Sequence, residues 1–258
     1  MAMPAKKPVK KAAAVAKSNV WSSMRFGKAN YAPLSPVTFL PRAAEIHPSR
    51  TAVVHGTKFI SYALFYQRAR RLASALERRG IKKGDVVSAM LPNIPAMLEA
   101  HYGVPVLGAV LNTINTRLDA DTVAYILEHA GSKVLVTDRM YAGVVGPALA
   151  RLKRKILVID VDDPLYTGPG DKLGELEYEA FIATGDPEFK WRLPEDDSDP
   201  IALNYTSDTT DRPKGVVCHH PGTFADPHGP PAPRAQPTAS GYPQHPPLVP
   251  PHPRRSSS

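Results

Sequence analysis

The stretch that decides the fold reads YTSDTTDRPKGVVCHH and spans residues 205–220. Its first half is rich in hydroxyl side chains, and the sequence RPKG at 212–215 follows, ahead of two valines. Residues 200–205 before it are mostly apolar, which is typical of a short buried strand. The pattern therefore predicts a strand, then a loop of hydroxyls with one lysine, then a second strand.

A loop of this composition is suited to holding a polyphosphate. Backbone N–H groups and hydroxyls donate to phosphate oxygens, and lysine adds a compact positive charge. The order of residues differs from that of the Walker A loop, Gly-x4-Gly-Lys-Ser/Thr. We therefore expect a phosphate-binding loop of another kind.

The same run resembles the signature loop of the AMP-forming acyl-CoA synthetases, or adenylate-forming ligases, which is written TSGTTGxPKG. The matching positions are Thr206, Ser207, Thr209, Thr210, Pro213, Lys214 and Gly215. Residues 31–220 continue the resemblance to the first part of the synthetase N-terminal domain. The stretch MLPNIPAMLEAHYGVPVLGAVLNTINTRLDADTVAYILEHAGSKVLVTD, at 90–138, is especially similar to short- and medium-chain fatty-acyl-CoA ligases.

Two aspartates depart from that signature, since Asp208 and Asp211 stand where it has its first two glycines. Glycine allows a positive φ angle and a close approach of backbone to phosphate, whereas aspartate visits the left-handed region less readily. Charge argues more strongly against nucleotide binding than backbone geometry does, because two carboxylates in a poorly hydrated site repel a triphosphate by several kcal/mol. Bridging by Mg²⁺ would reduce this repulsion. We expect impaired ATP binding.

The resemblance implies an acid–thiol ligase that uses ATP, Mg²⁺ and coenzyme A. Such enzymes join a carboxylic acid to ATP, release pyrophosphate, and pass the acyl group from the acyl-adenylate to the thiol. The nucleotide-binding positions that it implies are Thr206, Ser207, Asp208, Thr209, Thr210, Asp211, Lys214 and Gly215. His219 and His220 fall where similar enzymes have a histidine beside the acyl pocket. A metal site at this pair lacks a third ligand nearby, so we assign no metal ligand and no catalytic residue.

Other segments that the family requires would lie beyond the equivalent of His220. These are the adenine-binding segment, the ribose-binding aspartate, the hinge and the C-terminal domain with its catalytic lysine. We therefore expect an incomplete fold with unpaired sheet edges, and an inactive chain. Acyl-chain specificity and oligomeric state are not predicted.

The net charge of +8 comes from the first part of the chain. Eight Lys and Arg residues and no acid precede Glu45, so the remainder carries 24 basic and 24 acidic residues. Residues 1–30 are a basic arm rich in Lys and Ala, and we expect disorder there. The alternatives are an organelle transit segment or a tether to nucleic acid or an anionic membrane. The tether would make the chain a non-enzymatic binding protein, which is the rival hypothesis.

Residues 221–258 contain 12 prolines and almost no aliphatic side chains. Such a segment cannot bury a core, so we expect a disordered tail. It is either a proline-rich ligand for aromatic grooves or an out-of-frame sequence. We favour the out-of-frame interpretation, because the break follows the family match directly.

Between these ends, strands alternate with helices, which predicts an α/β fold with a mainly parallel sheet flanked by helices. The expected helices cover 38–47, 61–79, 94–108, 119–130 and 140–152, and the expected strands cover 51–55, 58–62, 85–91, 109–112, 133–138 and 155–160. The arginines of 61–79 have helical spacing and are interpreted as a solvated face. We further expect a surface helix and loop at 175–189, a partly buried His101 and a core position for Cys218.

No apolar run reaches the length of a membrane span, and the basic arm has no seven-residue apolar core, so we expect no secretory leader. The chain ends in Ser-Ser-Ser, which is not a peroxisomal signal. We therefore expect a soluble protein of the cytoplasm.

Overall fold

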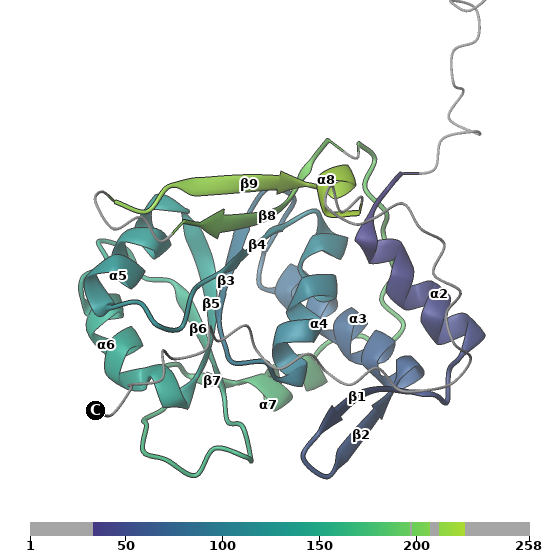
Figure 1. Cartoon of the computed structure of the whole chain (residues 1–258), viewed down its shortest axis with the longest axis horizontal. Coiled ribbons are helices and arrows are strands. Elements are labelled where there is room, and N and C mark those ends of the chain that lie inside the picture. The colour runs from purple at the N-terminus through teal and green to yellow at the C-terminus, as the bar shows by residue number, and fades with distance from the viewer. Residues whose placement is uncertain (1–32, 197, 207–211, 225–258) are drawn as a thin grey trace, which may run out of the picture. The chain divides into compact units, whose positions relative to one another are not determined.

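Strands alternate with helices along the chain, and the strands β3 to β9 form one seven-stranded sheet in the order β7-β6-β5-β3-β4-β8-β9 (Figure 1). Neighbouring strands run parallel, except that β9 is antiparallel to β8. The bounds are β3 (Val86–Met90), β4 (Val110–Thr113), β5 (Ser132–Asp138), β6 (Leu157–Val161), β7 (Leu176–Glu177), β8 (Pro200–Tyr205) and β9 (Gly215–His219). The predicted α/β class and its mainly parallel sheet are confirmed.

The computed structural model describes residues 33–196, 198–206 and 212–224. The chain divides into two units, residues 1–225 and residues 226–258. The predicted basic arm at 1–30 and all but the first residues of the predicted proline-rich tail lie outside the described residues. Both therefore stay predictions. Within the described part, no helix is long and apolar enough to cross a membrane.

Helices cover both faces of the sheet (Figure 1). Strand β5 shows why, because its side chains alternate between faces: Val134 and Val136 pack in one apolar cluster and Leu135 in another. The first cluster includes residues of α3 (Tyr62–Arg78), α4 (Pro95–Gly103) and α7 (Tyr178–Ala183). The second includes residues of α5 (Ala120–His129) and α6 (Ala142–Ala150).

The remaining elements are α2 (Phe39–Ile46), α8 (His220–Phe224), the hairpin strands β1 (Thr51–His55) and β2 (Lys58–Ser61), and the 3₁₀ turns η2 (Pro36–Thr38), η3 (Pro105–Leu107) and η4 (Arg139–Tyr141). The expected hairpin is confirmed, since β1 and β2 pair antiparallel. The helix expected at 94–108 is shorter than predicted, because α4 ends at Gly103 and a 3₁₀ turn follows.

Local capping explains where two helices begin. The Ser61 hydroxyl accepts from the N–H of Leu64 at 3.3 Å, and the Asp119 carboxylate accepts from the N–H of Thr122 at 2.9 Å. Gly80 follows α3 with a φ angle of 81°, a left-handed conformation that favours glycine and ends the helix.

The helix and loop expected at 175–189 are present, but the prediction that they lie on the surface was wrong. Strand β7 extends the sheet beside β6, and α7 buries Tyr178, Phe181 and Ile182 in the core. Phe189 is buried as well. The segment is too short for a clear periodicity, although the spacing of these three side chains by three and four is helical.

The predicted solvated face of arginines is found only at the end of α3, where Arg78 and the following Arg79 are exposed. The other three are half-buried and bind neighbouring segments. Arg70 donates to the carbonyl of Phe189 at 2.7 Å, and Arg71 donates to that of Ala183 at 3.3 Å. Arg68 lies between two carboxylates: its Nε is 2.6 Å from Glu99 Oε1, and its Nη2 is 2.7 Å from Glu179 Oε1. These arginines therefore hold the segment of α7 against α3.

Two single-residue predictions are also corrected. His101 is exposed rather than partly buried, and its Nδ1 lies 2.8 Å from the carbonyl oxygen of Met97. Cys218 is half-buried on β9, at the edge of the sheet, rather than in the core. In both cases the exposure of the side chain is set by where its helix or strand lies in the fold, and sequence periodicity alone does not show this.

Replacing Arg68 should be among the most destabilising single changes in the described part of the chain. Glu99 is fully buried, and Tyr178 Oη also donates to it at 2.7 Å. Arg68→Met would leave this carboxylate without its cation, and we expect a loss of about 3–5 kcal/mol in the free energy of unfolding. Urea denaturation measures this loss.

The matched control is Arg151→Met. Arg151 is paired with Asp121, and both side chains are well exposed, so the expected loss is about 1 kcal/mol or less. Equal losses for the two variants would contradict the role assigned to Arg68.

Candidate functional site

The carboxyl ends of the parallel strands meet at one edge of the sheet, and the candidate loop begins there. The pairing of β8 with β4 places Asn204 opposite Thr113, the last residue of β4. Tyr205, the last residue of β8, therefore lies at the carboxyl edge. Ligands of open α/β sheets bind outside this edge.

The two ends of the candidate loop are held together by the pairing of β8 with β9. Tyr205 lies opposite Gly215 in the ladder. One step further, the N–H of Thr206 donates to the carbonyl of Lys214 at 3.0 Å, and the N–H of Lys214 donates to the Thr206 hydroxyl at 3.4 Å. The strand–loop–strand prediction is confirmed, and Thr206 and Lys214 form the neck of the loop.

The tip of the loop lies outside the described residues. The expected nucleotide-binding positions Ser207, Asp208, Thr209, Thr210 and Asp211 belong to it, so their assignment stays a prediction. At the neck, Lys214 is exposed and takes part in no ion pair with another described residue. Its assignment as a nucleotide-binding residue stays a prediction.

The glycine at position 215, which is part of the TSGTTGxPKG signature, has a steric explanation. A Cβ atom at this position would lie 3.1 Å from Leu203 Cδ1 and 3.5 Å from Tyr205 Cζ. The glycine therefore permits β9 to pack closely against the side chains of β8. This role concerns the packing of the hairpin rather than phosphate contact.

A cavity of about 260 Å³ adjoins the loop at the same edge. Its lining residues come from the end of β4, the connection to α5, α5 and the end of β8, and they are Thr113, Ile114, Asn115, Leu118, Ile126, Asn204 and Tyr205. The Thr113 hydroxyl donates to Asn204 Oδ1 at 2.8 Å, which joins the ends of the two strands.

Side chains of α5 support the base of the loop. Tyr205 Oη lies 2.7 Å from His129 Nδ1, and His129 stacks at 5.3 Å on Tyr125. The guanidinium of Arg212 lies 5.3 Å from the centre of the Tyr125 ring. Burial raises the pKa of Tyr205, so its phenol stays protonated. Sequence reasoning missed this group, because nothing in the sequence links α5 to a loop 80 residues later.

The two histidines assigned to the acyl pocket have different environments. His220 is buried, and its Nδ1 lies 2.6 Å from the hydroxyl of Ser35. His219 is exposed and contacts the carbonyl oxygen of Ser198. His219 ends β9, about 13 Å along the strand from Gly215, and His220 begins α8, so both lie far from the loop. Their role beside an acyl pocket stays a prediction.

Comparison with known proteins assigns the chain to a family. The sequence profile described as AMP-binding enzyme matches residues 40–228. The chain belongs to the AMP-binding enzyme family. The resemblance expected from the loop signature is thereby confirmed.

Relatives in the AMP-binding family include named CoA ligases. The chain is 45% identical over 207 residues to the peroxisomal acetate/butyrate–CoA ligase AAE7 of Arabidopsis thaliana. It is 42% identical over 207 residues to the acetate–CoA ligase CCL3 of Humulus lupulus. Each alignment covers 76% of this chain and 36% of the relative. The chain therefore spans little more than a third of the length of these curated relatives.

Solved structures of AMP-binding enzymes share the fold. An anthranilate CoA ligase, AuaEII, in complex with anthranoyl-AMP superposes with a TM-score of 0.65 at 23% identity, over 76% of this chain and 37% of that one. The N-terminal domain of FACL13 from Mycobacterium tuberculosis gives a TM-score of 0.59 at 28% identity, over 72% of this chain and 44% of that one. The expected fold, the first part of the N-terminal domain of an adenylate-forming ligase, is confirmed.

Restoring glycine in the loop should strengthen nucleotide binding. The double variant Asp208→Gly, Asp211→Gly removes two negative charges from the sequence between Thr206 and Lys214. We expect it to bind MgATP about 10- to 100-fold more tightly than the unaltered chain. Isothermal titration calorimetry measures the two affinities.

The control adds Lys214→Met to the double variant and should abolish the gain in affinity. If the double variant binds no better than the unaltered chain, the aspartates are not what limits binding. If Lys214→Met has no effect, the lysine does not hold phosphate.

Proposed function

We propose that this chain is the first part of an AMP-forming acyl-CoA ligase. The full reaction would join a carboxylic acid to ATP, giving an acyl-adenylate and diphosphate, and then transfer the acyl group to coenzyme A with release of AMP. The observation that carries the proposal is the β8–loop–β9 hairpin, whose neck of Thr206 and Lys214 opens at the carboxyl edge of the sheet. Membership of the AMP-binding family supports it.

In this proposal the loop binds and neutralises the β- and γ-phosphates of ATP. The Lys214 ammonium acts as a point charge that offsets negative charge as the acid attacks the α-phosphate. The Thr206 oxygen accepts from the N–H of Lys214, which leaves its own O–H to donate to a phosphate oxygen. The hairpin hydrogen bonds hold these donors in place before the nucleotide arrives, which lowers the entropic cost of binding.

The oxygen donors of the loop also suit Mg²⁺, which prefers oxygen ligands and usually enters with substrate phosphates. When bound, Mg²⁺ would neutralise phosphate charge. No group of three or more metal-binding side chains exists among the described residues, which is compatible with a metal that arrives with ATP.

The proposed acid substrate is a small carboxylic acid, including the fatty acids. Relatives are named for acetate, butyrate, benzoate and trans-cinnamate, so the family covers several acyl groups. We assign His219 and His220 to the side of the acyl pocket. Of the two, His219 is exposed and so is the better candidate for a contact with substrate.

The 258-residue chain by itself is proposed to be inactive. It aligns with about a third of each ligase, and it carries Asp208 and Asp211 in the phosphate loop. A cytoplasmic location stays a prediction, since relatives such as AAE7 and AAE11 are named peroxisomal.

A chimeric ligase tests whether this segment works as proposed. The part of the Arabidopsis acetate/butyrate–CoA ligase that aligns with this chain is replaced by the corresponding residues of this chain, carrying Asp208→Gly and Asp211→Gly. We expect the chimera to catalyse acetate-dependent ATP–pyrophosphate exchange, because the fold and the neck of the loop are those of the family. A folded chimera without exchange would contradict the proposal.

Two matched controls accompany the chimera. The version that keeps Asp208 and Asp211 should be at least about 10-fold slower, since the carboxylates repel the triphosphate. The purified 258-residue chain should show no exchange with acetate or butyrate. Exchange by that chain would refute its proposed inactivity while leaving the ligase assignment intact.

A further inference from the structure

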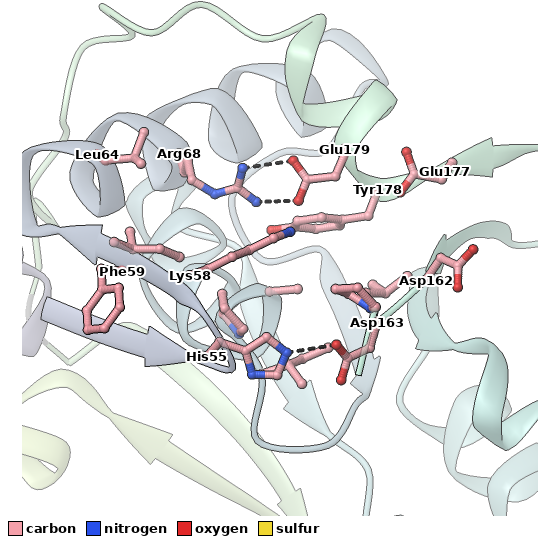
Figure 2. Close-up of a pocket in the computed structure, with 16 residues that line it drawn as sticks. His55, Lys58, Phe59, Leu64, Arg68, Asp162, Asp163, Glu177, Tyr178 and Glu179 are labelled. Atoms are coloured by element: carbon pink, nitrogen blue, oxygen red, sulfur yellow. Dashed lines mark hydrogen bonds and ion pairs between the residues drawn. The ribbon is translucent and has the colours of Figure 1, made fainter. Parts of the chain in front are cut away.

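A second cavity, of about 460 Å³, lies between the β1–β2 hairpin, α3 and the carboxyl end of β6 (Figure 2). The beginnings of α4 and α7 complete its walls. None of its lining residues belongs to the neck of the phosphate loop or to the cavity beside it. A pocket of this volume falls within the usual range for small-molecule sites.

The floor of this hairpin cavity is apolar and the mouth is exposed. Ile60, Ile94, Ala96, Val161 and Tyr178 are buried and line it. At the mouth, Phe59 is 68% exposed and Leu64 is 42% exposed, which is high for large apolar side chains. An apolar body that entered the cavity would cover all of these surfaces.

The charged residues of the wall include more carboxylates than cations. The carboxylates are Asp162, Asp163, Glu177 and Glu179, and the cations are Lys58 and Arg68. Arg68 is already offset by Glu99 and by Glu179, which lies opposite its guanidinium in Figure 2. Its hydrogen bonds and charge, with a smaller effect from Lys58, lower the pKa of Glu179. Arg68 is therefore already engaged by carboxylates.

Asp163 is the charged side chain in the buried part of the wall, at 8% exposure. Its Oδ1 lies 2.7 Å from His55 Nε2 (Figure 2). The same oxygen accepts from the N–H of Leu165 at 3.0 Å. Its Oδ2 accepts no hydrogen bond from another described residue, so this oxygen keeps an open acceptor. By contrast, Asp162 is held by Arg139, and Glu177 accepts from the N–H of Ala180.

We propose that the hairpin cavity binds a small organic ammonium with an apolar body. The ammonium would donate to Asp163 Oδ2, and the body would pack on Ile60, Ile94 and Val161. The ring of Phe59, which is exposed at the mouth, would cover the outer part of the apolar body. This inference is independent of the ligase proposal, since it involves neither the phosphate loop nor a nucleotide.

Three probes of nearly equal shape and different charge test the proposal on the 258-residue chain: 2-phenylethylamine, 2-phenylethanol and phenylacetate. We expect the amine to bind at least about 10-fold more tightly than the alcohol, as measured by calorimetry, and the carboxylate to bind least. Equal affinities, or tightest binding of phenylacetate, would overturn the assignment of ligand class.

Asp163→Asn preserves the shape of the side chain and removes its charge. In this variant the amine should bind no better than the alcohol. The matched control is Asp121→Asn, which removes an exposed carboxylate of α5 and should leave amine affinity unchanged. Undiminished amine binding by a folded Asp163→Asn variant would overturn the role of Asp163.

A measurement on the unaltered chain covers the case in which Asp163→Asn does not fold. Addition of 2-phenylethylamine should shift the NMR signals of His55, Ile60 and Tyr178 and leave those of Thr206 and Lys214 in place. Shifts confined to residues outside the hairpin cavity would overturn the proposal.

Discussion

The parallel pairing of β8 with β4 is the constraint on which the candidate site depends. It carries the chain from β7, at one end of the sheet, to the opposite side beside β4, and sets Tyr205 at the carboxyl edge. A buried polar row strengthens the sheet at this point: the Asn112 amide donates to Ser88 Oγ at 2.8 Å, and Ser88 Oγ lies 2.6 Å from Ser132 Oγ. Because each of these side chains is buried, a slip of one residue in register would separate them and leave polar groups unpaired.

Two ionic groups hold the outer elements: one joins three helices to one another, and the other joins the hairpin to the sheet. Glu99 joins α4 to α3 through Arg68 and to α7 through Tyr178, whose pKa is raised well above its usual value by burial and by the neighbouring carboxylate. The contact between His55 and Asp163 joins the β1–β2 hairpin to the end of β6. The hairpin cavity lies between these two groups, so its wall is fixed by the same interactions that hold the outer elements in place (Figure 2).

Much of the fold could be predicted from the sequence, because it depends on local signals. Ser61 and Asp119 cap helices, Gly80 ends one, and short apolar runs between the helical segments mark the strands. The loop signature likewise pointed to the family and to a strand on each side. The predictions that failed concern contacts between residues far apart in the sequence. The arginines of α3 have the spacing of a solvated face, but Arg70 and Arg71 bind carbonyls of the 183–189 segment, and only its position in the fold shows this. The sequence also does not show that two adjacent histidines have different environments: His219 on β9 is exposed, while the next residue, His220, is buried.

The most direct test of the account is an NMR titration of the Asp208→Gly, Asp211→Gly chain with MgATP. The account predicts shifts of the backbone amide signals of Thr206, Lys214 and Gly215, which lie at the neck of the loop, and no shifts in the β1–β2 hairpin. Saturable binding that leaves these three amides unchanged would contradict the assignment of the β8–β9 loop as the nucleotide site.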